Sequence, residues 1–287
     1  MFNYPRITTL PTDYIRTKIV QIMSEDIPKD DFTSLATIPA GSRSVAFIES
    51  LEEIVFAGEP IIREFFGEDY KLKLFAKDGD LVYKNGIIAE IEGPTIDLLK
   101  KERSMLNIIQ RLSGIATETA KYVEKTKPYG IKILDTRKTT PLLRLFEKYA
   151  VTVGGAYNHR LDLSSAILIK DNHIKASGSI SNAIKGAANY NLNIEIEAES
   201  MTEIEEICNN KINGILLDNM NPEITKKAVD YIRTKFTADE VYIISSGGIN
   251  LKNIDEYLTT GIDGISIGAI THSVKATDIR LEIGEAK

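Results

Sequence analysis

Charged residues recur at the carboxyl ends of short apolar runs in the second half of the chain. Asp135, Arg137 and Lys138 follow the run IKIL, and Lys170 ends the run AILIK. Arginine grips a carboxylate or phosphate through paired hydrogen bonds, and lysine supplies a compact positive charge. By itself, the stretch DTRKTT (135–140) fits a solvated turn as well as an anion site. Its position at the end of an expected strand favours the anion site.

Three glutamates alternate with apolar residues in the run IEIEAES. Glu195, Glu197 and Glu199 are two residues apart, so in a strand they share one face. If that face lines the interior, the carboxylates need cations or a metal, because an unpaired buried charge is costly. The candidate partners are Arg137, Lys138 and Lys170. We expect Glu197 to be functional, whereas Glu195 and Glu199 suit solvent equally well.

Small residues follow the last two apolar runs. Ser246, Gly247 and Gly248 end VYIISSGG, and Gly268 and Ala269 lie in GISIGAI. In (β/α) barrels the loops after the final strands often bind phosphate through backbone N–H groups, and glycine lets the backbone approach closely. A short SGG also occurs in ordinary turns. Its place after a late strand favours phosphate.

The histidines differ in context. His159 and its neighbour Arg160 follow a glycine pair in GGAYNHR, which favours contact with a ligand. His173 suits either a structural or a ligand role, and His272 is expected to be structural. The spacing of the three does not match a zinc site. Cys208 lies in a helical pattern and is expected in the core.

Alternating elements must position these residues. After about residue 128, six runs rich in Ile, Leu and Val are separated by helical stretches, which is typical of parallel strands in a βα repeat. Polar residues at the ends of five runs, Asp218 among them, would then converge on one face of an incomplete (β/α) barrel. Residues 12–110 read as mixed α and β. The stretch 95–126 reads as one long helix or as two, with Gly114 as the expected break.

Composition excludes several classes of protein. The chain has 287 residues with 43% apolar residues and a single cysteine, so no internal disulfide is possible. No apolar run approaches the ~18 residues of a membrane span, and no secretory signal is recognised. The net charge of −6 argues against nucleic-acid binding. Residues 101–175 nevertheless carry 14 Lys and Arg against 7 Asp and Glu, which suits an anionic ligand or a basic surface. A cytoplasmic location is expected.

The motifs, in order, resemble the quinolinate phosphoribosyltransferase (nicotinate-nucleotide pyrophosphorylase, carboxylating) family. The resemblance runs from about residue 20 to the C-terminus and rests on long segments: ERSMLNIIQRLSGIAT, DTRKTTPLLR, KYAVTVGGAYNHRLDL, LIKDNHI, IEIEAES, LLDNM, SSGGI and ISIGAIT. It implies transfer from phosphoribosyl pyrophosphate to quinolinate, with Mg²⁺, giving nicotinate mononucleotide, pyrophosphate and CO₂. It also implies an α/β sandwich domain plus an open, incomplete (β/α) barrel, in a homodimer with shared active sites.

The resemblance assigns roles to individual residues. Arg103 would reach the partner's site, and Arg137, His159 and Arg160 would grip the quinolinate carboxylates. Lys138 and Lys170 would line the site near both substrates. Glu197 and Asp218 would face the ribose hydroxyls and the metal-bound pyrophosphate. The 5′-phosphate would be cradled by Ser246, Gly247, Gly248, Gly268 and Ala269.

The resemblance also implies domain limits and leaves rivals. Residues 1–115 would form the sandwich, with 272–287 returning to it, and residues 116–271 the barrel. Leu142 stands where the family usually has glycine, which puts the geometry of that loop in question. The alternatives are a paralogue acting on nicotinate or another anion, a Schiff-base aldolase using Lys170, and a phosphate-sugar binding protein without catalysis.

Overall fold

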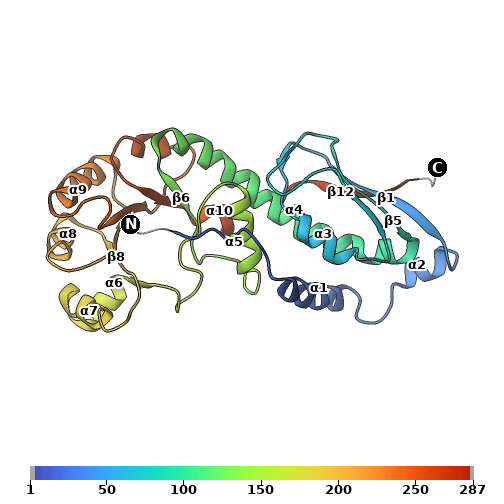
Figure 1. Cartoon of the computed structure of the whole chain (residues 1–287), viewed down its shortest axis with the longest axis horizontal. Helices are drawn as coiled ribbons and strands as arrows, with labels where there is room; N and C mark the ends of the chain where they lie inside the picture. The colour runs from blue at the N-terminus through green and yellow to red at the C-terminus, as the bar shows by residue number, and fades with distance from the viewer. Residues whose placement is uncertain (1–3, 285–287) are drawn as a thin grey trace. The chain divides into compact units, whose positions relative to one another are not determined.

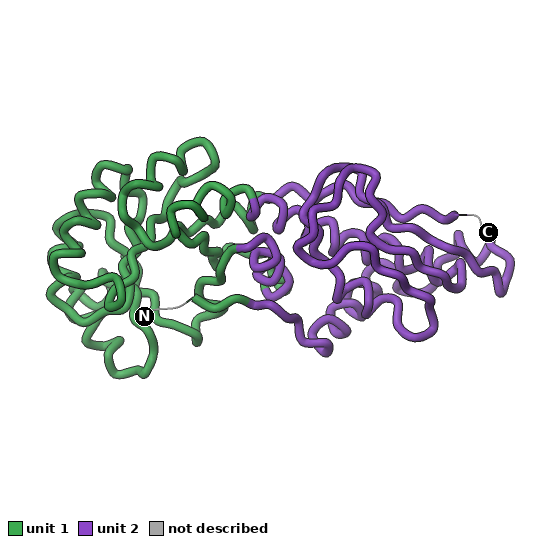
Figure 2. Tube along the Cα trace, turned by 45° about the horizontal axis from the view of Figure 1, so that its top comes forward, with its two compact units in different colours: residues 1–6, 121–144, 156–273 green, residues 7–120, 145–155, 274–287 purple. Residues whose placement is uncertain are grey.

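The computed structural model describes residues 4–284 and divides into two compact units, coloured in Figure 2. Unit 1 comprises Lys121–Arg144 and Ala156–Ser273 with the N-terminal residues up to Arg6. Unit 2 comprises Ile7–Ala120, Leu145–Gly155 and the C-terminal residues from Val274. This division differs from the predicted limits by two exchanged segments, because Tyr4 packs in the core of unit 1 and Phe146 packs edge-on against Tyr14 in unit 2. The limits themselves lie a few residues later, after Ala120 and after Ser273.

Unit 2 is built on an antiparallel sheet with the strand order β12-β1-β5-β3. Its strands are β1 (Arg43–Ser50), β2 (Ile54–Val55), β3 (Lys71–Leu74), β4 (Leu81–Val82), β5 (Ile87–Pro94) and β12 (Ile279–Gly284). Its helices include α1 (Thr12–Asp26), α2 (Phe32–Thr37), α3 (Glu59–Phe65) and α5 (Arg144–Val153). The pairing of β12 with β1 brings the C-terminal segment into this sheet, whereas residues 285–287 of the predicted return lie outside the described residues.

The predicted break at Gly114 is wrong. One continuous helix, α4, runs from Thr95 to Thr126 through this glycine. A Cβ at Gly114 would lie 2.4 Å from the backbone oxygen of Lys275, which is closer than atoms can approach. Glycine is therefore needed here for close packing of the C-terminal segment against α4, and the helix pays only a modest entropic penalty for it.

Unit 1 contains all six predicted strands in one parallel sheet, ordered β6-β11-β10-β9-β8-β7. These are β6 (Lys132–Leu134), β7 (Ile167–Ile169), β8 (Ile194–Ala198), β9 (Gly214–Asp218), β10 (Tyr242–Ser246) and β11 (Gly264–Ser266). The connecting helices are η1 (Lys127–Tyr129), α6 (Asp171–Ser177), α7 (Ile180–Ala187), α8 (Met201–Ile207), α9 (Pro222–Lys235), η2 (Ile254–Tyr257) and α10 (Ala269–His272). Figure 1 shows α8 and α9 on the outer side of this sheet. The sheet is the expected open, incomplete (β/α) barrel.

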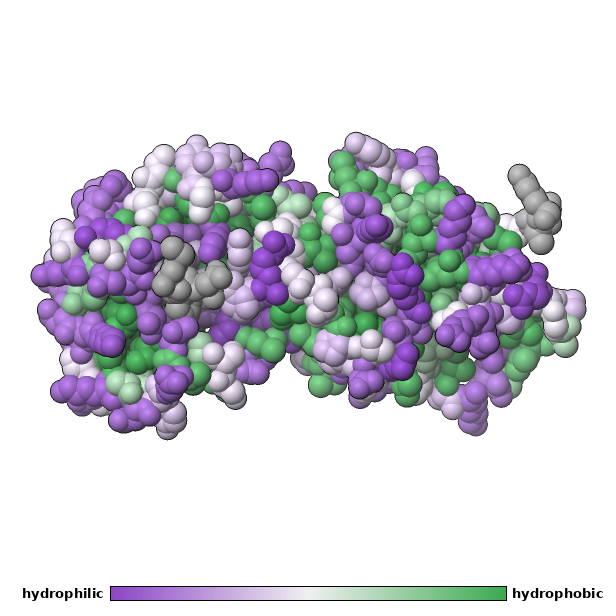
Figure 3. All heavy atoms as spheres, in the orientation of Figure 1, coloured by the Kyte–Doolittle hydropathy of each residue, from purple (hydrophilic) through white to green (hydrophobic). Residues whose placement is uncertain are grey.

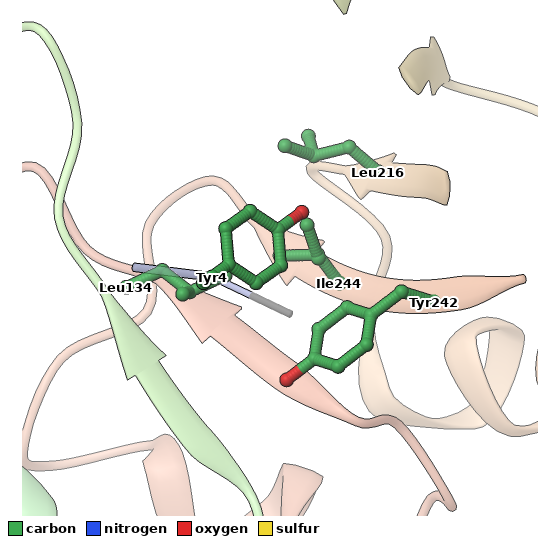
Figure 4. Packing of buried hydrophobic residues seen from close by; sticks show 5 residues of the cluster. All are labelled: Tyr4, Leu134, Leu216, Tyr242 and Ile244. Carbon is green, nitrogen blue, oxygen red and sulfur yellow. The ribbon is translucent and has the colours of Figure 1, made fainter. Parts of the chain in front are cut away.

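The core of unit 1 includes a residue from the N-terminal segment. Tyr4, 3% exposed, packs among Leu134, Leu216, Tyr242 and Ile244 (Figure 4). The backbone N–H of Asn158 donates to the carbonyl oxygen of Pro5 at 2.9 Å, which ties the segment to the loop before His159. The segment is therefore part of the barrel.

Burial and hydropathy bear on the predictions for Cys208 and for membrane-spanning segments. The predicted core residue Cys208 is buried, with 8% exposed, at the end of α8. Hydrophilic and apolar residues are interspersed over the face seen in Figure 3. Among the described residues, the helices lack the length and apolar character needed to cross a membrane.

Candidate active site

A cavity of about 350 Å³ lies at the carboxyl ends of the barrel strands. Every strand of the sheet supplies a residue to it, either from its last two positions or from the loop that follows. The lining consists of Asp135, Thr136, Arg137, Lys138, His159, Arg160, Leu168, Lys170, Glu197, Leu216, Asp218, Ser246 and Ser266. The barrel thus brings together eight of the predicted residues, because the carboxyl ends of parallel strands meet on one face.

Three cations face this cavity without a carboxylate partner. Within the described residues, Arg137, Lys138 and Arg160 form no ion pair within 4 Å. Burial, and then the like charge of Arg137, lower the pKa of Arg160. Like charges held together at a partly buried place are unfavourable until an anion neutralises them. The arrangement is suited to an anion with more than one charge.

The same cavity also carries carboxylates. Glu197 on β8 forms a close ion pair with Lys170, which follows β7. Asp218 ends β9 and accepts a hydrogen bond at 2.8 Å from the side-chain amide of Asn219. The cavity therefore combines carboxylates with cations that have no carboxylate partner.

Asp135, the first residue of DTRKTT, connects two of the segments that line the cavity. It is fully buried and accepts hydrogen bonds from Asn158 Nδ2 at 2.7 Å and from the backbone N–H of His159 at 2.8 Å. It therefore joins the end of β6 to the NHR segment. No role of its own was predicted for Asp135, although a carboxylate at a strand end before two cations was a signal that could have indicated one.

Glu195 also has a role that the alternation left open. It is 1% exposed, and its Oε2 lies 2.7 Å from His159 Nε2. Glu197, two residues on, lies on the same face of β8, as the alternation predicts. Glu199 is exposed instead, just beyond the end of the strand. The face of β8 is thus confirmed, and Glu195 belongs to the interior rather than to solvent.

The glycines after β10 have backbone conformations that other residues resist, and the glycine after β11 has close neighbours. Gly247 and Gly248 have φ of +91° and +67°, and a Cβ at Gly247 would lie 2.2 Å from Asn219 Oδ1. A Cβ at Gly268 would lie 3.1 Å from Lys138 Cδ and 3.1 Å from His272 Cδ2. His272, expected to be structural, is therefore a neighbour of Lys138 and Gly268. Ala269 begins the short helix α10.

Other predicted residues lie outside the cavity lining. Gly247, Gly248, Gly268 and Ala269 follow the two strands that supply Ser246 and Ser266 to the lining. His173 caps α6, its Nδ1 accepting from the backbone N–H of Lys170 at 3.0 Å, which is a structural role. Arg103 is exposed on α4 in unit 2. Lining residues absent from the predicted site are Asp135, Thr136, Leu168, Leu216 and Ser266. Asp135 and Thr136 stand in the DTRKTT stretch, whereas the two leucines belong to the apolar runs of the strands and gave no separate signal.

Leu142 has a backbone conformation that glycine adopts most readily. Its φ is +65°, in the left-handed region, and its side chain is 76% exposed. The loop after DTRKTT therefore follows a glycine-like course although leucine disfavours it. The geometry of this loop, which the sequence left in question, is therefore accompanied by backbone strain at Leu142.

The chain matches two domain families over most of its length. Residues 31–113 match the quinolinate phosphoribosyl transferase N-terminal domain, and residues 115–282 match the C-terminal domain. A probable nicotinate-nucleotide pyrophosphorylase (carboxylating) of Bacillus subtilis is 43% identical over 266 residues, covering 90% of each chain. The nicotinate-nucleotide pyrophosphorylase (carboxylating) of Mycobacterium leprae is 38% identical over 94% of this chain and 98% of its own.

Solved structures of similar proteins have the same fold as this chain. The nicotinate-nucleotide pyrophosphorylase from Francisella tularensis superposes with a TM-score of 0.91 at 34% identity, covering 98% of this chain and 100% of that one. The similarity extends over both units, and the motifs that line the cavity lie within the matched residues. The chain belongs to the quinolinate phosphoribosyl transferase family.

Proposed function

We propose that the chain transfers the phosphoribosyl group of phosphoribosyl pyrophosphate to quinolinate, releasing pyrophosphate and CO₂ and giving nicotinate mononucleotide. The observation that carries this proposal is the group of cations Arg137, Lys138 and Arg160, which line one cavity without carboxylate partners in the described part of the chain. Quinolinate carries two adjacent carboxylates, and two guanidinium groups can each grip one. The names of the relatives support the same reaction.

The carboxylates of the cavity and the glycines next to it suit the phosphoribosyl donor. Departure of pyrophosphate leaves positive charge on the ribose, and the carboxylates of Glu197 and Asp218 would stabilise it as it develops. The glycine loops after β10 and β11 let the backbone approach a 5′-phosphate, since Gly247 and Gly248 lack the Cβ that would obstruct it. Lys138, beside Gly268, would lie between the two substrates.

Decarboxylation requires little further from the protein. Once the pyridine nitrogen bonds to the ribose it is positively charged, and loss of CO₂ from the 2-position leaves a ring carbanion that this charge stabilises. The carbanion then takes a proton from water, which gives the product. The site would contribute by holding the ring. Positioning and electrostatics would then account for most of the rate, without a dedicated acid and base.

Mg²⁺ is proposed to enter with the donor. In the described residues, no three His, Cys, Asp or Glu side chains lie close enough together to form a metal site. Two carboxylates, Glu197 and Asp218, line the same cavity, and this number suits an ion held mainly by substrate phosphates. Bound there, the ion would neutralise charge on the departing pyrophosphate.

The site is proposed to be completed by a second copy of the chain. The family resemblance assigns Arg103 to the partner's quinolinate, and this arginine is exposed, its nearest ion-pair partner being Glu102 at 3.9 Å. Mixing Arg103→Ala with Lys138→Ala tests the arrangement, because a mixed dimer would contain one site with both residues intact. Partial recovery of activity is expected, and no recovery would contradict shared sites. The soluble substrates suit the cytoplasmic location expected from the sequence.

The reaction itself is tested by mixing the pure protein with quinolinate, phosphoribosyl pyrophosphate and Mg²⁺. Nicotinate mononucleotide and CO₂ are expected in equal amounts. Turnover of nicotinate without turnover of quinolinate would contradict the substrate assignment and favour a paralogue. Binding of the donor without any product would indicate a non-catalytic protein.

A Schiff-base aldolase makes a different prediction for Lys170. The amine is engaged by Glu197 in a close ion pair, whereas an imine-forming lysine must be uncharged to attack a carbonyl. Borohydride reduction with a range of carbonyl compounds is therefore expected to give no adduct at Lys170. A stable adduct identified by mass spectrometry would overturn this expectation.

A further inference from the structure

We propose that Tyr4 and Glu195 are positioning residues of the acceptor site, which hold the imidazole of His159 from behind. His159 lines the cavity, whereas Tyr4 and Glu195 do not. The inference rests on the proposed assignment of His159 to quinolinate, and it adds the N-terminal segment to the residues that determine acceptor binding.

Tyr4 supports one face of the imidazole. The two rings stack with centroids 5.4 Å apart and an interplanar angle of 27°. Tyr242 packs edge-on against the same tyrosine, with centroids 5.1 Å apart at 71°, so Tyr4 cannot tilt freely. The segment is also anchored next to the histidine, through the hydrogen bond from Asn158 to Pro5 and through Arg6, which lies over the ring of Tyr157 at 5.5 Å. Tyr4 is thus a fixed surface against which the imidazole lies.

Glu195 sets the rotation of the ring. A hydrogen bond to one imidazole nitrogen fixes the ring plane and determines which nitrogen a ligand meets. The 2.7 Å contact from Glu195 Oε2 engages Nε2, so the ring cannot turn over without losing it. The backbone of His159 is held separately by Asp135. Ring and backbone of His159 are therefore fixed from two different strands, β8 and β6.

The burial of Glu195 indicates that this support has a function. The carboxylate is 1% exposed in the interior of the barrel, and burying a charge is costly even when it is paired. An apolar residue would fill the same space with less loss of solvation energy. The neighbouring Tyr4 is affected too: burial, followed by the charge of Glu195, raises the pKa of its hydroxyl. Orientation of a ligand-contacting histidine is the gain that offsets this cost.

The test compares the Michaelis constants of the two substrates. Glu195→Gln keeps the size of the side chain but removes the charge, and we expect the KM for quinolinate to rise about 10-fold, the lower range for residues that orient a ligand-binding histidine. Tyr4→Leu keeps much of the volume but loses the flat ring, and a rise in the same KM is expected. The KM for phosphoribosyl pyrophosphate should change little in both. Tyr4→Phe, which retains the stack, should restore most of the loss seen with leucine.

Tyr257→Leu is the matched control. Tyr257 is also a buried tyrosine of unit 1, 6% exposed, and its hydroxyl donates to the backbone oxygen of Met220 at 3.0 Å. Its replacement should lower the melting temperature without changing the ratio of the two KM values. If Tyr4→Leu and Glu195→Gln behave like this control, their role is structural only and the inference fails. Should Tyr4→Leu not fold, Glu195→Gln, which preserves shape, decides the question.

The variant His159→Ala distinguishes failure of the proposed positioning by Tyr4 and Glu195 from failure of the assignment of His159 to quinolinate. If His159→Ala leaves the KM for quinolinate unchanged, the assignment of His159 is wrong and the inference falls with it. If His159→Ala raises this KM whereas Glu195→Gln and Tyr4→Leu do not, the assignment stands and the inference alone is refuted. In the double variant His159→Ala with Glu195→Gln, we expect no rise beyond that of His159→Ala, because Glu195 would act only through the imidazole.

Discussion

Replacing Leu142 with glycine should stabilise the protein, although it removes a large side chain. Leu142 has φ of +65°, where the Cβ of an L-residue approaches the following carbonyl. Its side chain is 76% exposed, so little packing is lost on removal. The backbone already has the course that glycine would adopt. The change therefore isolates the strain stored in the loop after DTRKTT.

The magnitude follows from two opposing terms. Relief of the left-handed conformation contributes about 1–2 kcal/mol. The extra freedom of glycine in the unfolded chain costs about 0.5–1 kcal/mol. The net gain is about 0.8 kcal/mol, at the centre of these ranges. For a chain of this size, such a gain raises the melting temperature by roughly 2 °C.

Two further variants identify the cause. Leu142→Ala removes the exposed side chain but keeps the Cβ, so its melting temperature should stay near that of the parent. Leu163→Gly changes another exposed leucine of unit 1, 71% exposed, whose φ is not positive. It should lower stability by about 0.5–1 kcal/mol, since only the entropic term applies. Thermal unfolding followed by circular dichroism measures all three.

The reasoning would be refuted by either of two results. Destabilisation by Leu142→Gly equal to that of Leu163→Gly would show that no strain is stored at position 142. Equal stabilisation by Leu142→Ala and Leu142→Gly would show that the exposed side chain, rather than the backbone, is the source.

Three further predictions address other parts of the chain. Gly247→Ala places a Cβ 2.2 Å from Asn219 Oδ1 at a residue with φ of +91°. It should therefore raise the KM for phosphoribosyl pyrophosphate and destabilise unit 1 by about 1–3 kcal/mol. The control Gly186→Ala, which adds a Cβ in open space on α7, should have neither effect. Arg137→Lys should raise the KM for quinolinate about 10-fold in initial-rate assays, because an ammonium cannot form the paired hydrogen bonds of a guanidinium. An unchanged KM would contradict the binding of a quinolinate carboxylate by Arg137. Burial raises the pKa of Asp78 in the folded protein, so the contribution of this residue to stability is present below its unfolded-state pKa and is lost as the pH rises through its folded-state pKa. Urea unfolding between pH 3 and 7 should show this loss of stability in the parent but not in Asp78→Asn. Parallel dependence of stability on pH in the two proteins would refute the prediction.

Much of the barrel was predictable from local pattern. The six runs rich in Ile, Leu and Val became the six strands of the parallel sheet, because strands buried on both faces need apolar side chains throughout. Strand periodicity also placed Glu195 and Glu197 on one face of β8. The prediction at Gly114 failed because it also used local pattern alone. A glycine was taken as a helix break, whereas the reason for this glycine is the segment at Lys275, far along the chain, which packs against it.

The sequence by itself determined the chemical types at the site and the order in which they occur. Cations after β6, glutamates along β8 and glycines after β10 follow from motifs of adjacent residues, and these motifs also indicated the family. Only the tertiary structure decided which of these residues meet. Asp135 joins the NHR segment, Glu195 orients His159, and Tyr4 supports the same ring from far along the chain. Such contacts depend on how separate strands converge, and no spacing within a single segment records that convergence.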